Sequence, residues 1–366
     1  MTKRTRLTIL LACVVLFFTL TPAIVGYSLG YRFDLKHKKI VATGGIYVRA
    51  LPQGADIAID LKVKNKTGIF YQTVFAQNLV PGEHNVSIKK DGYFDYQKTL
   101  EVKEKEVTKL ENVILFKQNI AFETLPSTVQ SPFSGPKQPE KFILKNNNLY
   151  YSDILENVGI SATIKNTQVL KNVAGFQILN NNILWAGANG LVYNSDASGK
   201  LLNAVSKTEL APIVLGSPEF FIFSNKIYLL WNDTLLFIDQ EKNESEPVYN
   251  PVKNAKISPD NRQILIFNDY EILLYPADSN ASEKIFLNRF SEKINDCFWL
   301  NNDYIIYGLE NKIEISEIDL RGNMNTVVLP DKLAATGNSE IFFNQQEGKL
   351  YILTDNTVYV SEKLTP

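Results

Sequence analysis

Phe142-Ile-Leu-Lys-Asn-Asn-Asn-Leu-Tyr-Tyr151 and Phe176-Gln-Ile-Leu-Asn-Asn-Asn-Ile-Leu-Trp185 are two copies of one pattern: an apolar segment, an asparagine turn and a second apolar segment. Asparagine favours the tight turns that join antiparallel strands, so each copy predicts a β-hairpin. Further copies start 45, 36, 41 and 44 residues after one another, at Phe221, Ile257, Phe298 and Phe342. Additional strands are expected within the copies, as in Glu271–Pro276 and Lys312–Ile318.

A repeat of about 40 residues with four strands per unit is typical of a β-propeller blade. We therefore predict a β-propeller of about six blades over residues 140–364. A large β-sandwich and a β-solenoid are the alternatives; a sandwich would not repeat near 40 residues, and solenoid repeats are shorter. Ile257-Ser-Pro-Asp-Asn-Arg262 resembles the strand-turn motif of WD40-like and TolB-like propellers, although the Gly-His start and Trp-Asp end of the WD40 repeat are absent.

The N-terminal region predicts a membrane segment. Lys3, Arg4 and Arg6 precede an uncharged run of 25 residues, 7–31, which as a helix would span roughly 37 Å, against about 30 Å for a hydrocarbon core. We predict an uncleaved signal anchor over residues 7–31, with residues 1–6 in the cytoplasm and the rest of the chain outside it. The positive charges on the two sides are nearly balanced, so the orientation follows from the exported character of the β region.

Two other readings of this segment remain open. A cleaved signal peptide would use Thr21-Pro22-Ala23, a poor small-residue site, but the apolar run exceeds the 7–15 residues of a signal-peptide core. A lipoprotein signal would use Leu10-Leu11-Ala12-Cys13. Because the apolar run continues well beyond Cys13, that residue is better interpreted as part of a helix.

Residues 44–116 predict a small β domain. Apolar side chains occur at every second position in three stretches, as expected for half-buried strands: Ile46/Val48/Ala50, Ile57/Ile59 and Val86/Ile88. Together with Gly45-Ile-Tyr-Val48, Pro52-Gln-Gly-Ala-Asp-Ile-Ala-Ile59, Val80-Pro-Gly-Glu-His84 and Lys90-Asp-Gly-Tyr93, this stretch resembles the PEGA domain family. The resemblance implies a small sandwich-like module of cell-surface proteins that binds a partner or acts as a spacer. It implies structural roles in turns for Pro52, Gly54, Ala55, Pro81, Gly82 and Gly92, and no catalytic residue.

The stretch 118–139 predicts an extended linker, because four of the fifteen prolines fall within it. Part of it, Ile120–Leu125, can still pair as a strand, and either this segment or Tyr351–Val360 is expected to help close the propeller ring.

The composition offers little material for catalysis. Of the two histidines, His37 and His84, neither lies in the predicted propeller, so a histidine-based triad is excluded there. Of the two cysteines, Cys13 lies in the apolar run and Cys297 in an apolar strand; a disulfide scaffold and a thiolate zinc cluster are excluded. We expect no metal, no cofactor and, from the net charge of −1, no nucleic-acid partner.

Other possible sites have structural alternatives. Asn194–Gly199 has the composition of a calcium loop but lacks the terminal glutamate, and it predicts a hairpin turn. Trp185, Trp231 and Trp299 could stack on sugars, although core packing is the commoner role.

We predict a membrane-anchored binding or scaffolding protein of the cell envelope whose propeller meets a protein or glycan partner. The ligand-binding residues and the oligomeric state are unknown at this stage. The alternative is a carbohydrate-active enzyme that uses propeller carboxylates. A sensor is a third reading, weakened by the six-residue cytoplasmic end. Converging carboxylates in the propeller would favour the enzyme, and an aromatic or polar surface poor in carboxylates would favour the binder.

Overall fold

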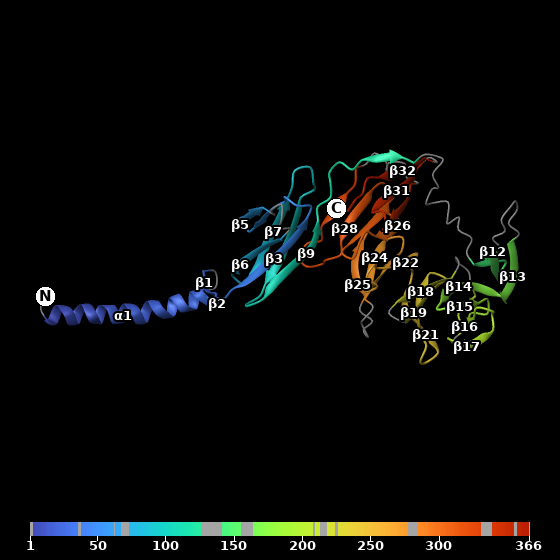
Figure 1. Ribbon diagram of the computed structural model, residues 1–366, viewed down its shortest axis with the longest axis horizontal. Coiled ribbons are helices and arrows are strands. Elements are labelled where there is room, and N and C mark those ends of the chain that lie inside the picture. Colours follow the sequence, from blue (N-terminus) through green and yellow to red (C-terminus); the bar gives the residue numbers. More distant parts are fainter. Residues whose placement is uncertain are drawn as a thin grey trace. The chain divides into compact units, whose positions relative to one another are not determined.

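The computed structural model describes residues 3–35, 38–61, 63–66, 73–125, 141–154, 164–207, 209–212, 218–223, 226–276, 284–330, 339–354 and 357–365. They form two units. The first contains residues 1–121, 316–330 and 363–366, and the second contains residues 122–315 and 331–362. Apart from one N-terminal helix, all regular elements within these described ranges are β-strands, as predicted (Figure 1).

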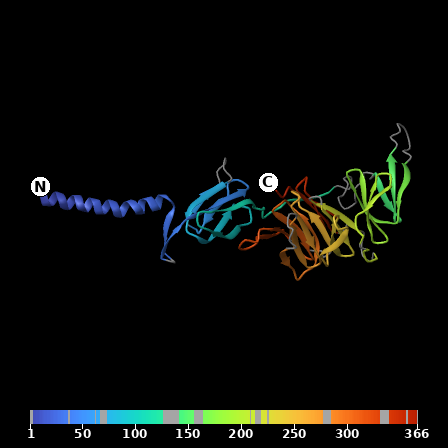
Figure 2. The ribbon, with the colours of Figure 1, turned by 90° about the horizontal axis from the view of Figure 1, so that it is seen from below.

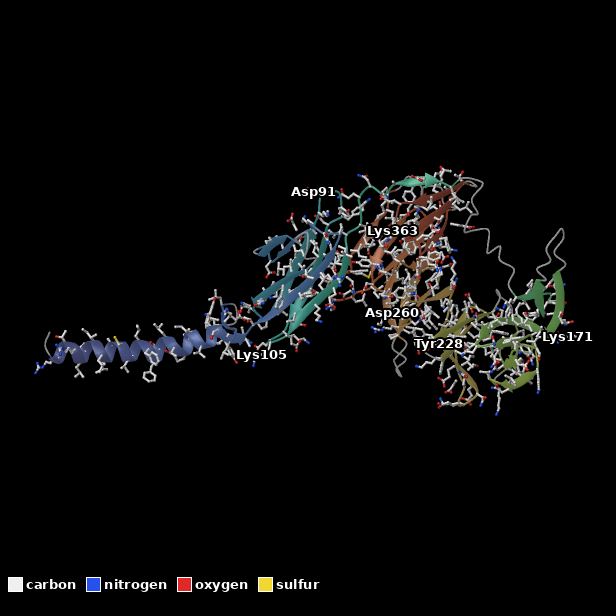
Figure 3. All side chains as sticks on the ribbon, in the orientation of Figure 1. Asp91, Lys105, Lys171, Tyr228, Asp260 and Lys363 are labelled. Carbon is white, nitrogen blue, oxygen red and sulfur yellow. The ribbon has the colours of Figure 1, made fainter. Side chains whose placement is uncertain are left out.

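Helix α1 runs from Lys3 to Ser28 and includes Pro22. Residues 4–28 are long and apolar enough to cross a membrane, and Figure 3 shows their side chains projecting on all sides of the helix. The helix stops short of the predicted residue 31, and Tyr31 already belongs to a strand. The break lies at Gly30, whose φ of +85° is the left-handed conformation that commonly ends helices.

A hairpin that the sequence patterns did not predict follows the helix. Strand β1 (Tyr31–Asp34) pairs antiparallel with β2 (Lys39–Ala42), with Phe33 opposite Ile40. In Figure 2 this hairpin projects sideways from the end of α1 instead of continuing along it.

The small β domain consists of two sheets. One has the order β6-β3-β9 and the other β5-β4-β7-β8. Their strands are β3 Gly44–Leu51, β4 Asp56–Ile59, β5 Val63–Lys66, β6 Thr73–Leu79, β7 Gly82–Lys89, β8 Tyr96–Val102 and β9 Val107–Ile114. The alternating apolar residues of the sequence form the buried core between the sheets, as period-two patterning predicts.

The first unit also contains a distant part of the chain. Residues 316–330, which include β29 (Thr326–Val328), meet β8 of the small domain. Lys98 Nζ donates to Glu317 Oε1 at 2.6 Å and to the carbonyl oxygens of Asp319 and Asn323. Glu317 Oε2 accepts from the Tyr96 hydroxyl at 2.8 Å. This buried ion pair therefore uses all three lysine donors.

Two asparagines of this segment bond to the backbone of β8. The Gln97 amide donates to Asn325 Oδ1 at 3.1 Å, and the Thr99 amide donates to Asn323 Oδ1 at 3.2 Å. Asn323 Nδ2 in turn donates to the Gln97 carbonyl at 2.7 Å. Because β8 lies at the end of its sheet, these side chains cover backbone groups that an edge strand would leave unpaired.

The strands after residue 121 form a β-propeller of successive antiparallel sheets (Figure 1); β29 and the last two residues of β28, although grouped with the first unit, belong to one of these sheets. In chain order the strands are β11 Phe142–Lys145, β12 Asn148–Ile154 and β13 Ile164–Lys171; β14 Val173–Leu179, β15 Asn182–Gly187, β16 Val192–Asp196 and β17 Leu201–Ala204; β18 Glu219–Phe223, β19 Lys226–Trp231, β20 Thr234–Asp239 and β21 Glu244–Tyr249; β22 Asn254–Ile257, β23 Gln263–Phe267, β24 Glu271–Pro276 and β25 Ile285–Arg289; β26 Ile294–Trp299, β27 Tyr304–Leu309, β28 Ile313–Glu317 and β29; and β30 Glu340–Asn344, β31 Lys349–Thr354 and β32 Thr357–Ser361.

The asparagine turns predicted for the first two copies are present, whereas that of the copy at Phe221 falls on residues 224–225, outside the described residues. Asn146–Asn147 and Asn180–Asn181 have positive φ angles in the tight turns β11–β12 and β14–β15, and Asn232–Asp233 do so in β19–β20. Positive φ at both central residues matches the twist of paired strands, and asparagine tolerates this conformation better than most residues. The repeated Asn pairs thus explain the register of these hairpins.

The final sheet is completed from the N-terminal side. Strand β10 (Phe122–Thr124) pairs with β32, and the sheet order is β10-β32-β31-β30. Both predicted closing segments therefore take part in one sheet. Residues 122–124 of the predicted linker 118–139 form this strand, within the segment Ile120–Leu125 that the sequence allowed to pair; the four prolines of the linker lie outside the described residues.

Apolar side chains fill the space between neighbouring blades. One cluster joins the sheet of β18–β21 to that of β22–β25 and includes Phe223, Tyr228 and Ile264. Tyr228, labelled in Figure 3, has only 1% of its surface exposed. Another cluster joins β14–β17 to β18–β21. The propeller core is thus built from face-to-face contacts between successive sheets.

Candidate functional site

The turn residues predicted in the small domain lie at or near the ends of its strands. Pro52 and Gly54 follow β3, and Gly54 has a φ of +80°. Ala55, directly before β4, is fully buried. The remaining three lie around β7, where Pro81 precedes the strand, Gly82 starts it and Gly92 follows it with a φ of +80°.

A pocket of about 360 Å³ lies on the first strands of three successive propeller sheets, β22, β26 and β30. No motif in the sequence predicts it. Its lining consists of Lys256, Ile257, Phe298, Trp299, Phe342, Phe343, Asn344, Gln345 and Gln346. We refer to it as the inner-strand pocket.

Two aromatic side chains give the pocket an apolar surface. Phe298 and Phe342 lie edge to face, with ring centroids 5.8 Å apart, and both remain partly exposed. Trp299 beside them is buried, and its Nε1 donates to the Lys256 carbonyl at 2.8 Å. This bond ties β26 to β22, and edge-to-face packing fixes the two rings relative to each other.

Lys256 supplies the positive charge of the pocket. Its Nζ lies 2.6 Å from Asp296 Oδ1 and 3.2 Å from the centre of the Phe298 ring. Partial burial lowers the pKa of Lys256, and the Asp296 carboxylate opposes this shift. The ammonium group is therefore held by a carboxylate on one side and an aromatic face on the other.

The turn between β30 and β31 contributes amide groups. Gln345 Nε2 donates to the Trp299 carbonyl at 3.1 Å, and Asn344 Oδ1 accepts from the Gln346 amide at 3.0 Å. These bonds fix the turn, and they place three amide side chains beside the two phenylalanine rings.

Carboxylates contribute little to this surface. The described lining contains no aspartate or glutamate. Asp296 is engaged by Lys256, and Glu219 at the start of β18 has its pKa raised by partial desolvation, which the charge of Lys256 opposes. By the criterion set from the sequence, an aromatic and amide surface favours binding.

Other residues singled out from the sequence have structural roles. Cys297 is buried, and burial raises its pKa, so it is an inert core thiol. Asp196 Oδ1 accepts from the backbone amides of Ser198 and Lys200, as expected for the predicted hairpin turn. Within the described residues, no cluster of three or more His, Cys, Asp or Glu side chains could hold a metal ion.

The three tryptophans differ in exposure. Trp231 and Trp299 are buried in the propeller core, whereas Trp185 is half-buried and stacks on Tyr193 at 4.5 Å. The Trp185 Nε1 donates to Ser195 Oγ at 3.0 Å. Core packing, the commoner role, therefore holds for Trp231 and Trp299.

The motif at residues 257–262 also stabilises a turn. Ser258 Oγ accepts from the backbone amides of Arg262 and Gln263 and donates to Asp260 Oδ1. Asp260, labelled in Figure 3, is exposed in the β22–β23 turn. These bonds account for the Ser-Pro-Asp-Asn sequence without a ligand.

Comparison with known proteins identifies the small domain. Residues 43–115 match the family model described as PEGA domain. This part of the chain is a PEGA domain. The match confirms the resemblance seen in the sequence and covers about a fifth of the chain. No curated protein matches the chain.

Solved structures to which the chain is similar include two β-propeller proteins. Hsv2 of Kluyveromyces lactis is 11% identical with a TM-score of 0.42, and the alignment covers 60% of this chain and 69% of that one. YCF48 from Cyanidioschyzon merolae is also 11% identical with a TM-score of 0.42, and the alignment covers 87% of this chain and 98% of that one.

Proposed function

We propose that this protein is a membrane-anchored, extracytoplasmic binding protein of the cell envelope, and that the inner-strand pocket of its propeller takes the partner. The observation that carries the proposal is the pocket surface itself, in which Phe298 and Phe342 lie beside the amides of residues 344–346. Aromatic faces bind apolar faces of sugar rings or peptide side chains, and amides bind their polar groups.

The carbohydrate-active enzyme has less support. Glycoside hydrolysis needs two carboxyl groups on either side of the scissile bond, one of them free to donate a proton. Asp296, the carboxylate beside the pocket, forms an ion pair with Lys256 at 2.6 Å. A binding role requires no such pair of groups.

The membrane anchor rests on α1. Its 25-residue apolar stretch also fits a signal peptide. We propose that α1 is retained and that the PEGA domain and propeller lie outside the cytoplasm. Protease added to intact spheroplasts should then digest the propeller, and the mature protein should start before Leu7. A soluble mature form starting near Ile24 would replace the anchor with a cleaved signal.

Binding is tested with the full chain in nanodiscs. Panels of neutral oligosaccharides and of peptides are titrated against the wild type and against Phe298→Ala, with saturation-transfer NMR as the readout. The matched control is Phe286→Ala, an exposed phenylalanine on β25. We expect Phe298→Ala to weaken binding by at least tenfold, about 1.4 kcal/mol, and Phe286→Ala to leave it unchanged. If the wild type hydrolysed a panel member and the Asp296→Asn variant did not, the enzyme would be favoured instead.

A further inference from the structure

The hairpin that follows α1 exposes a set of large apolar side chains. Leu29, Phe33, Leu35 and Ile40 have 69%, 57%, 82% and 71% of their surface exposed. Phe33 and Ile40 are directly opposite each other in the β1–β2 register, so they share one face of the hairpin. We call this set, with the strands that carry it, the juxtamembrane hairpin (residues 29–35 and 38–42).

The hairpin is firmly attached to the end of the helix. Arg32 Nη1 donates to the Tyr27 carbonyl at 2.6 Å, and the guanidinium lies 3.5 Å from the centre of the Tyr27 ring. The Thr43 amide and hydroxyl both donate to the Gly30 carbonyl, at 2.9 and 2.7 Å. The apolar face therefore stays close to the point where α1 ends.

Water is an unfavourable surrounding for this face. Each exposed leucine- or phenylalanine-sized side chain forgoes the favourable free energy of burial, and a two-stranded hairpin is marginally stable on its own. The hydrocarbon core is equally unsuitable, because the outer edges of a two-stranded sheet carry unpaired backbone groups. The headgroup region between them can solvate the backbone and bury the apolar side chains.

The position and charge of the hairpin both fit that region. Its first strand begins three residues after Ser28, the end of the apolar helix, and the hairpin projects sideways from the helix, as an element lying along the membrane surface would (Figure 2). Lys38 and Lys39 next to Ile40 are exposed cations, which suit anionic headgroups.

We propose that the juxtamembrane hairpin lies in the headgroup region of the bilayer, with Leu29, Phe33, Leu35 and Ile40 inserted among the lipids. This rests on the proposed retention of α1 in the membrane. The hairpin would then be a second membrane contact, which fixes the height and tilt of the PEGA domain over the bilayer.

The test uses nitroxide labels on one introduced cysteine of the full chain, in phosphatidylcholine nanodiscs with or without phosphatidylglycerol. The background is Cys13→Ser, in which the remaining native cysteine, Cys297, is buried. Leu35→Cys reports on the hairpin, and Leu61→Cys is the matched control, a leucine of the same unit with 81% of its surface exposed. Leu16→Cys reports on α1. The ratio of oxygen to nickel-chelate collisions measures the depth of each label.

We expect the ratio at residue 35 to be several-fold higher than at residue 61, and lower than at residue 16. Lys38→Glu with Lys39→Glu should lower the ratio at residue 35 when phosphatidylglycerol is present, whereas the control pair Lys103→Glu with Lys109→Glu should not. A water-like ratio at residue 35 with a membrane ratio at residue 16 overturns the hairpin proposal and leaves the anchor intact. Water-like ratios at both residues overturn the anchor as well. Spin–spin broadening between copies at residue 35 would mean that a second copy covers the face, and the lipid proposal would be wrong.

Discussion

Replacing Lys98 with methionine should strongly destabilise the contact between β8 and residues 316–330. Lys98 is fully buried, and Glu317 is nearly so. In the variant, Glu317 keeps bonds from Tyr96 and Asn325 but loses its counter-charge. Removing one partner of a buried pair typically costs about 3–5 kcal/mol, because the other charge is left uncompensated.

That cost has an upper limit set by the structure. If residues 316–330 detach, water reaches Glu317 again, so the loss cannot exceed the free energy that holds the segment on β8. Hydrogen exchange followed by mass spectrometry measures the loss of free energy directly, because the Gln97 and Thr99 amides donate to Asn325 and Asn323 of the segment. A loss of 3 kcal/mol corresponds to roughly 150-fold faster exchange.

The control is Lys109→Met, which breaks an exposed ion pair with Glu111 at 3.8 Å. Exposed pairs contribute about 0–1 kcal/mol, so exchange in β8 should change by less than about fivefold. Adding Glu317→Gln to Lys98→Met should recover part of the loss, since no buried charge remains. Equal effects of Lys98→Met and Lys109→Met would mean that the buried Lys98–Glu317 pair does not hold residues 316–330 on β8.

Three further outcomes follow from the same structure. Burial alone would raise the pKa of Asp319, but hydrogen bonds from Arg321 and the charge of Lys98 outweigh it and hold the pKa below the ordinary 3.8. The stabilisation is thus complete above about pH 4 and lost as the pH falls through the lowered pKa. The protection factors of the β8 amides, which correct for the pH dependence of intrinsic exchange, should therefore fall on acidification, and less so in Asp319→Asn. Cys297 should resist alkylation in the native protein and react only after unfolding, because it is buried and burial raises its pKa; native labelling at a normal thiol rate would contradict this. Leu125→Pro removes the hydrogen bond that the Leu125 amide donates to the Val358 carbonyl at 2.7 Å. It should destabilise the propeller by about 1–3 kcal/mol, measured by urea unfolding with tryptophan fluorescence. Leu125→Ala is the control, because it keeps the amide.

Features set by local sequence could be predicted. The copies near residues 142, 176, 221, 257, 298 and 342 each fall on or beside the first strand of a sheet, because alternating apolar residues and asparagine turns act over a few residues. The alternating residues of the PEGA domain form its core for the same reason. The end of α1 was misplaced by three residues because Leu29 and Tyr31 are as apolar as the helix, and the backbone at Gly30 decides the boundary.

Features that depend on long-range pairing could not be predicted. Lys98 and Glu317 are 219 residues apart, and nothing near either residue marks it as buried. The inner-strand pocket joins β22, β26 and β30, and only the repeated aromatic anchors Phe298 and Phe342 hinted at it. A third anchor, Phe221, packs in the core instead, so the repeat alone does not reveal which anchors face a pocket.

The central claim is that the inner-strand pocket of the propeller binds the partner. The most direct measurement is hydrogen exchange of the full chain in nanodiscs, with and without the solubilised polysaccharide fraction of the cell envelope, and separately with its peptide fraction. Binding in the pocket should slow exchange in peptides covering β26 and the β30–β31 turn with one of these fractions, and should cause no slowing in Phe298→Ala. Protection confined to the PEGA domain or to the outer strands of the propeller, with β26 and β30 unchanged, would contradict it.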